Sequence, residues 1–250
     1  MRVTYASERG VGARNEDYAA AAMDWAFVLD GATAAPGVDS GCRHDVRWLV
    51  ERLGAALAWE LSAARRPTLP DALAGAIERV RADHGGGCDL GNPDSPSATV
   101  AVARRAEDGA GVEYLVLADS AVLLPDPDGK VTVVCDDRLD HLPGGRPYSR
   151  ELVSASRNVP GGFWVASTVA EAAHEAVTGS VRCEDPRFAL LTDGCTRLAE
   201  YYGHPWSSVW EHLDEHGPDS LISWVRAEER RHGVPRGKRH DDATALYARP

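Results

Sequence analysis

Short apolar runs divide the first third of the chain into predicted strands followed by predicted helices. Residues 3–6 and 18–22 are brief apolar stretches, and the run from Trp25 to Leu29 stops at Asp30-Gly31, as expected of short strands. From residue 43 to residue 65 the apolar positions recur at steps of three and four, which predicts one face of a long helix. A second helix is predicted from Thr68 to the glycines at 85–87.

The middle of the chain contains apolar runs that follow one another too closely for helical crossovers. Turn-forming residues separate them, and this spacing is typical of antiparallel neighbours. The predicted strands are residues 97–104, 112–118, 121–124 and 130–135.

The last part of the chain mixes a long polar segment with further strands and helices. Residues 136–162 are rich in Gly, Pro, Arg and Asp, and a loop of this length is usually functional, so we expect a flap beside the substrate. Strands are predicted at 163–165, 188–192 and 243–248, and helices at 168–177, 193–202, 206–213 and 219–231. No Ser/Gly linker divides the sequence, which predicts one α+β domain over residues 1–250.

The composition and net charge restrict the kinds of molecule that the protein is expected to bind. The chain has 250 residues, 44% of them hydrophobic, which is enough for one sizeable core. Its 27 basic and 38 acidic residues give a net charge of −11, which disfavours nucleic acid and membrane surfaces as partners. No run approaches the roughly 18–20 apolar residues that cross a bilayer, and the start lacks the apolar core of a secretion signal. The expected location is the cytoplasm.

Five cysteines are scattered along the chain without a C-x-x-C pair. An odd, dispersed set argues against a disulfide framework and against a cysteine zinc site. We expect reduced, buried thiols. The cysteines are Cys42, Cys88, Cys135, Cys183 and Cys195.

Carboxylates occur where several predicted strands begin or end. A single aspartate there is usually a turn or cap residue, because its oxygens accept hydrogen bonds from nearby backbone N–H groups. If four of these strands lie side by side, their carboxylates would instead form one cluster, which could not stay ionised without a cation. Oxygen ligands favour Mg²⁺ or Mn²⁺ over zinc. The residues are Asp30, Asp119, Asp193 and the pair Asp241-Asp242.

Six short motifs extend this pattern over nearly the whole chain. In chain order they are Arg14-Asn15-Glu16-Asp17, Val28-Leu29-Asp30-Gly31, Ser97-Ala98-Thr99, Ala118-Asp119-Ser120, Leu191-Thr192-Asp193-Gly194 and Asp241-Asp242-Ala243-Thr244. This ordered set resembles the metal-dependent (type 2C) protein serine/threonine phosphatases in their compact bacterial form. The resemblance implies a four-layer α-β-β-α sandwich, in which helices flank two mainly antiparallel sheets and a two-metal site lies at one edge.

The resemblance also implies a role for each motif residue. The implied metal ligands are Asp30, the Gly31 carbonyl, Asp193 and Asp241, with Asp119 for a third, weaker ion. Asp30 would bridge two Mn²⁺ or Mg²⁺ ions, and Glu16 and Asp17 would orient their waters. A metal-held water would then attack the phosphorus of phosphoserine or phosphothreonine in a protein substrate, without a covalent enzyme intermediate.

Three positions depart from the family's pattern. Ala32 replaces a residue that is often a His acting as general acid, so protonation of the leaving group falls to water. Arg197 stands where the family often has a further aspartate, which puts the third ion in doubt. Arg14 directly precedes Asn15 and is the predicted phosphate-binding arginine, with Arg9 as the alternative and a plain surface charge as a third interpretation of either.

Other interpretations remain open at this point. A phosphatase-like regulatory or binding module with little activity is one, supported by Arg197 and the Ala32-Thr33-Ala34 run. A phosphatase for a small phosphorylated metabolite is another. The basic run 226–239 is read as a solvated helix face followed by a loop, with substrate docking as the minority alternative. The sequence predicts no oligomeric state.

Overall fold

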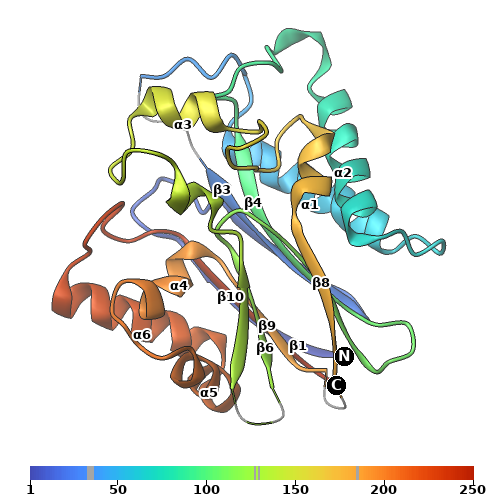
Figure 1. Ribbon diagram of the computed structural model, residues 1–250, viewed down its shortest axis with the longest axis vertical. Helices are drawn as coiled ribbons and strands as arrows, with labels where there is room; N and C mark the ends of the chain where they lie inside the picture. Colours follow the sequence, from blue (N-terminus) through green and yellow to red (C-terminus); the bar gives the residue numbers. More distant parts are fainter. Residues whose placement is uncertain (33–36, 127, 129, 184–185) are drawn as a thin grey trace.

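Two antiparallel five-stranded sheets form the centre of the protein (Figure 1). The computed structural model describes residues 1–32, 37–126, 128, 130–183 and 186–250. One sheet consists, in order, of β1 (Arg2–Glu8), β10 (Ala243–Arg249), β9 (Phe188–Leu191), β6 (Ala121–Pro125) and β7 (Val131–Cys135). The other consists of β2 (Asp17–Ala21), β3 (Trp25–Ala32), β4 (Ser97–Arg105), β5 (Gly111–Leu117) and β8 (Val177–Arg182).

Helices cover the outer face of each sheet, on opposite sides of the molecule in Figure 1. Helices α1 (Val46–Leu61) and α2 (Leu69–Asp83) pack on the sheet that contains β3 and β4. Helices α4 (Asp193–Glu200), α5 (Trp206–His216) and α6 (Pro218–His232) pack on the sheet that contains β9 and β10.

Apolar side chains that alternate in direction along the strands form the core layer between the two sheets. Phe27 and Leu29 face α1 and α2, whereas Ala26 and Val28 face the other sheet, because successive strand residues point to opposite faces. The predicted four-layer α-β-β-α sandwich is therefore confirmed.

The two long helices begin and pack as the sequence predicts. The Asp45 side chain accepts a hydrogen bond from the backbone N–H of Trp48 at 2.8 Å, which caps α1. Thr68 accepts a bond from the N–H of Asp71 at 3.2 Å and caps α2. Among the described residues, no helix is both long and apolar enough to span a membrane.

The sequence prediction of a helix at 168–177 is wrong. Only a 3₁₀ segment, Ala170–Glu175, forms there, and the edge strand β8 follows it. Strand β8 was missed because it alternates between exposed and half-buried residues and contains Gly179. A Cβ at Gly179 would lie 2.3 Å from Tyr114 Oη, so this glycine is needed for close packing and is no sign of a turn.

The segment 136–162 contains more regular secondary structure than the loop that the sequence predicts. It contains a 3₁₀ turn, Arg138–His141, and the short helix α3 (Arg150–Ser156), which Ser149 caps. A small separate core of Ala118, Leu142, Phe163 and Val165 holds it against the sheets. The predicted strand at 163–165 is wrong, since only single bridges form there.

Candidate metal and phosphate site

Asp30 lies inside strand β3, whereas the sequence pattern placed it where the strand ends. Strand β3 continues to Ala32, and Asp30 is opposite Asp17 on β2 and opposite Thr99 on β4. The strand passes through Gly31 because a side chain is excluded there: a Cβ would lie 2.7 Å from the Glu16 carbonyl oxygen. The family motif around Asp30 is therefore held on both sides by strands.

Asp193 and Asp241 come from neighbouring strands, as the sequence pattern predicts. Asp193 is the first residue of α4, directly after β9, and Asp241 precedes β10. Strands β9 and β10 pair, and the Thr192 N–H donates to the Thr244 carbonyl at 3.0 Å just beside the two aspartates. Pairing of the two strands thus brings carboxylates 48 positions apart in the chain to one edge of the sheet.

Asp119 is presented by the tight turn between β5 and β6. Ala118 has φ +64°, a left-handed conformation that costs a residue with a Cβ about 1–2 kcal/mol. The buried Asp136 stabilises this turn, because its Oδ2 accepts the Ala118 N–H at 3.1 Å. Glycine would adopt this conformation without the strain that Ala118 carries.

The carboxylates raise one another's pKa. Burial raises the pKa of Asp30 well above its ordinary value, and the charges of Asp193, Asp17, Asp119 and Asp241 raise it further. Burial, followed by the charges of Asp119 and Asp241, raises the pKa of Asp193 to about 8. Such a group either takes up protons or binds cations.

Asp17 offers a more specific sign of a missing partner. Its Oδ2 accepts hydrogen bonds from Thr192 Oγ1 at 3.0 Å and from Thr244 Oγ1 at 2.6 Å. Its Oδ1 is buried and has no hydrogen-bond partner within the described part of the chain. Burial raises the pKa of Asp17 to about 7, although the two threonine hydrogen bonds lower it. A buried carboxylate oxygen without a donor, beside other carboxylates, fits hard divalent cations and their waters.

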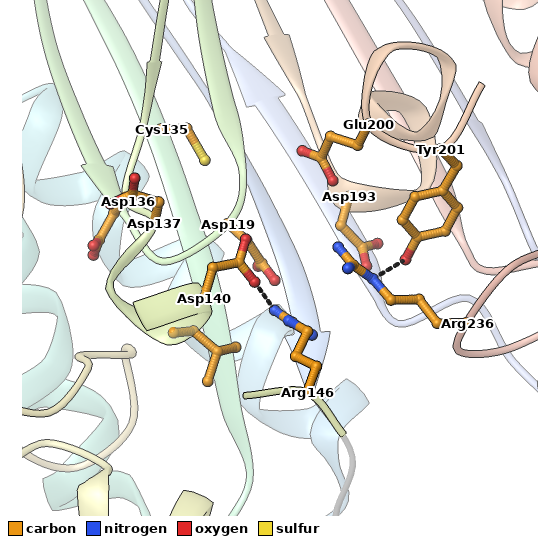
Figure 2. A pocket seen from close by; sticks show the side chains of 11 residues that line it. Asp119, Cys135, Asp136, Asp137, Asp140, Arg146, Asp193, Glu200, Tyr201 and Arg236 are labelled. Carbon is orange, nitrogen blue, oxygen red and sulfur yellow. Dashed lines mark hydrogen bonds and ion pairs between the residues drawn. The ribbon is translucent and has the colours of Figure 1, made fainter. Parts of the chain in front are cut away.

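A cavity of about 90 Å³ joins Asp119 and Asp193 (Figure 2). Figure 2 shows Glu200 and Tyr201 on one side of it, and Asp140 with Arg146 on the other. Burial raises the pKa of Glu200, and the charges of Asp119 and Asp140 add to this. The sequence analysis missed Glu200, although it follows Asp193 by two turns of one helix and therefore shares its face.

Comparisons with known proteins agree with this geometry. The sequence model of the family described as Protein phosphatase 2C matches residues 6–226. The chain belongs to this family. No curated protein matched the sequence.

Solved phosphatase structures share the fold at low sequence identity. The serine/threonine phosphatase PstP/Ppp of Mycobacterium tuberculosis has a TM-score of 0.64 and 18% identity, over 98% of this chain and 97% of that chain. The PPM Ser-Thr phosphatase MsPP of Mycobacterium smegmatis has a TM-score of 0.61 and 16% identity, over 99% and 97%. A structure of the PstP catalytic domain described as containing two manganese ions has a TM-score of 0.62 and 18% identity, over 98% and 96%.

Arg197, the main departure from the phosphatase 2C pattern, is directed at Asp241. Its Nη2 donates to Asp241 Oδ2 at 3.1 Å and its Nη1 to Glu229 Oε1 at 2.7 Å. Lys238 Nζ donates to the other Asp241 oxygen at 2.8 Å. Both oxygens of a predicted metal ligand thus contact protein cations, a feature that the spacing of the sequence could not reveal.

The basic run 226–239 is solvated, as the sequence predicts, at all of its Arg and Lys residues except Arg226. Arg226 is 6% exposed and donates to Glu229, to Glu8 and to the Asp241 carbonyl. Arg236 lines the cavity of Figure 2 and donates to Tyr201 Oη. Arg226 and Arg236 therefore lie at the edge of the site, and substrate docking by this run stays a prediction.

The N-terminal motif lies against Asp242. The Gly10 and Glu16 N–H groups each donate to a different oxygen of Asp242 at 2.7 Å. Arg14 is exposed, 3.8 Å from Asp45, and it lines a hollow together with Lys238 and Asp241. The alternative arginine, Arg9, donates to the Ala13 carbonyl. The Thr33–Pro36 run discussed in the sequence analysis lies outside the described residues.

Proposed function

We propose that this phosphatase 2C family member is a metal-dependent protein serine/threonine phosphatase. The observation that carries the proposal is the cluster of Asp30, Asp193, Asp119 and Asp241, in which burial and then the neighbouring charges raise the pKa of Asp30. Asp17 supports it, because one of its buried oxygens has no partner among the described residues. Oxygen-only donors favour Mn²⁺ or Mg²⁺ over Zn²⁺.

In this proposal, Asp30, the Gly31 carbonyl, Asp193 and Asp241 would hold two ions. Asp119 and Glu200 form the surroundings of a third, weaker ion, although Glu200 was not part of the sequence-based prediction. When bound, the ions supply Lewis acidity and an activated water at neutral pH.

The chain's own residues complete the chemistry by orienting water and by binding the phosphoryl group. Asp17 and Glu16 orient waters from behind the ligands, and the two threonine hydroxyls fix the Asp17 carboxylate for this role. Arg14, at the edge of the hollow with Asp241, binds the phosphoryl oxygens. Ala32 has no titratable group, so water protonates the leaving alkoxide.

A second hollow supports a peptide substrate. It has a volume of about 340 Å³ and lies between the flap 136–162 and Asp119, with Phe163 and Val165 among its apolar lining. Arg157, which also lines it, has a buried Nη2 without a hydrogen-bond partner in the described residues. A peptide carbonyl or carboxylate flanking the phosphorylated residue would satisfy this donor.

Hydrolysis of p-nitrophenyl phosphate with and without Mn²⁺ tests the enzyme proposal. Asp30→Ala and Asp193→Ala should each lose more than about 100-fold in turnover, because each removes a metal ligand. Asp108→Ala is the matched control, since Asp108 is exposed on a surface turn, where it pairs with exposed Arg182 and accepts the Ala110 N–H. Unchanged turnover in the two site variants would contradict the mechanism.

The same assay on a phosphothreonine peptide and on a small sugar phosphate separates the substrate classes. A higher kcat/KM for the peptide supports a protein substrate, and the reverse preference supports the metabolite alternative. Arg157→Met should raise the peptide KM and leave p-nitrophenyl phosphate hydrolysis unchanged.

A regulatory module with little activity is the second candidate. The observation in its favour is that both Asp241 oxygens contact Arg197 and Lys238. Folded wild-type protein without turnover at any Mn²⁺ concentration would support this candidate.

A further inference from the structure

Two cysteines and two histidines converge at the ends of α1 and α2, although the sequence analysis expected isolated buried thiols. Cys42 Sγ lies 3.3 Å from Cys88 Sγ, and His44 Nδ1 lies 3.6 Å and 3.5 Å from these two sulfurs. Ligand atoms of Cys42, His44 and the buried His84 lie within 4.8 Å of one another. Neither Cys42 nor Cys88 is fully buried.

The spacing of these atoms matches the edges of a tetrahedral zinc site. Zn–S bonds of about 2.3 Å and Zn–N bonds of about 2.0–2.1 Å place sulfur and nitrogen ligands about 3.6 Å apart and two sulfurs about 3.8 Å apart. The two observed sulfur–nitrogen distances agree, and the sulfurs are slightly closer. A disulfide requires about 2.05 Å between the sulfurs.

His84 makes a backbone hydrogen bond that is typical of a ligating histidine. Its Nδ1 lies 2.8 Å from the Val80 carbonyl oxygen, and a carbonyl can only accept, so Nδ1 carries the proton. The lone pair is then on Nε2. A hydrogen bond from the other ring nitrogen to a backbone carbonyl is the usual support of a metal-bound imidazole.

Trp48 holds both imidazole rings in place. Its ring stacks on His44 with centroids 3.9 Å apart and meets the edge of His84 at 4.6 Å. The cluster is therefore preorganised by an aromatic wall from α1 and by the end of α2. Such walls restrict ring rotation and water access around a metal.

The cluster joins two segments that the chain otherwise connects weakly. Cys42 and His44 precede α1, and His84 and Cys88 follow α2. Backbone and amide hydrogen bonds already link them: Asp89 N–H donates to the Gly41 carbonyl at 2.8 Å and Asn92 Nδ2 to the Asp39 carbonyl at 3.1 Å. An ion at the cluster would complete this link.

We propose that Cys42, His44, His84 and Cys88 bind one Zn²⁺ as a structural site, distinct from the carboxylate cluster. Binding exchanges the two thiol protons for the ion, so two H⁺ are released and two neutral imidazoles complete the shell. Two thiolates balance the charge of the ion. The proposal does not depend on phosphatase activity.

Cobalt substitution distinguishes this site from the carboxylate cluster. Co²⁺ added to metal-free, reduced protein should give thiolate-to-cobalt charge-transfer absorption, which oxygen ligands cannot produce. Cys88→Ser and Cys42→Ser should reduce this absorption and the bound zinc by about tenfold or more. Cys183→Ser, which changes a thiol beside the turn at 108–110, should retain both, as should Asp193→Asn.

Wild-type protein gives a test that no folding defect can obscure. A mercurial thiol reagent should release about one zinc per chain from protein purified without chelator and treated with excess Mg²⁺. The proposal is wrong if wild-type protein binds Co²⁺ without charge-transfer absorption, or if Cys42 and Cys88 form a disulfide under reducing purification. It is also wrong if Cys183→Ser loses as much zinc as Cys88→Ser.

Discussion

The carboxylate cluster and the cysteine–histidine cluster are built from opposite kinds of ligand. Asp30 and Asp193 carry charge that burial makes costly, and the pKa of both is raised. Thiols and neutral imidazoles carry no charge before an ion binds, so Cys42, His44 and their partners can approach one another freely. An acidic cluster is therefore stabilised either by cations or by protons, whereas the sulfur–nitrogen cluster needs a cation only to become cross-linked.

This difference in charge explains why arginine and lysine side chains lie beside the acidic cluster. Arg197 and Lys238 contact Asp241 in the acidic cluster. Asp241 thus has two partners of opposite charge even before a metal ion arrives. The comparison can be tested by removing these cations one at a time and by changing the protonation of the acids.

Arg197→Met should have the largest effect on stability. The Arg197 and Glu229 side chains are 2% and 0% exposed and lie 2.7 Å apart. Removing one partner of a buried pair costs about 3–5 kcal/mol. Glu229 keeps its contact with Arg226 at 3.0 Å, so the loss should lie at the low end of this range. Urea unfolding should show this loss as a lower midpoint at unchanged slope.

Arg182→Met is the matched control for this substitution. Arg182 pairs with Asp108 at 3.2 Å, but the two side chains are 82% and 54% exposed, so the loss should stay below about 1 kcal/mol. Equal losses in Arg197→Met and Arg182→Met would show that the buried cation does not stabilise the acidic cluster. Cobalt absorption at the cysteine–histidine cluster should be the same in both variants.

The sequence predicted the acidic cluster better than the sulfur–nitrogen cluster for a physical reason. Aspartates beside apolar strands are brought together by strand pairing, which periodicity reveals, and β9 and β10 do pair as expected. Cys42 and Cys88 lie on irregular segments, and their positions depend on how α1 and α2 pack. The spacings Cys42-x-His44 and His84-x₃-Cys88 are present in the sequence, but neither contains the C-x-x-C pair that is typical of a zinc site.

Two errors in the fold prediction have the same origin. Strand β8 was missed because its exposed edge carries only a weak alternation of apolar residues. The end of β3 was set too early because Gly31 resembles a strand stop, whereas its missing side chain permits contact with Glu16. Long-range packing, which one sequence does not display, decides both cases.

Changing the pH in the absence of metal should change the free energy of unfolding by an amount between those expected for Arg197→Met and Lys238→Ala. The pKa of Asp17 is raised from 3.8 to about 7 and that of Asp193 to about 8, mainly by burial. The folded protein therefore binds more protons than the unfolded chain between these values. The stability that protonation provides is complete below about pH 4 and is lost as the pH rises through 7 to 8.

Asp193→Asn isolates this contribution, because asparagine resembles the protonated acid. In EDTA the variant should be more stable than wild type at pH 8, by roughly 1–3 kcal/mol, with the difference shrinking towards pH 4. Thermal unfolding across this pH range measures the difference. A difference that does not change with pH would contradict the raised pKa of Asp193.

Lys238→Ala should have the smallest effect on stability and a measurable effect on metal binding. Lys238 Nζ lies 2.8 Å from Asp241 Oδ1, but its side chain is 50% exposed, so the loss of stability should be below about 1 kcal/mol. Without the Lys238 contact, Asp241 should bind Mn²⁺ more readily. The Mn²⁺ concentration that gives half-maximal turnover should therefore fall by about two- to fivefold. Lys130→Ala, which removes an exposed lysine paired with Asp128, should leave that concentration unchanged. An unchanged Mn²⁺ requirement with a raised substrate KM would instead make Lys238 a phosphate-binding residue, and the acidic cluster would then share its fixed cation with the substrate.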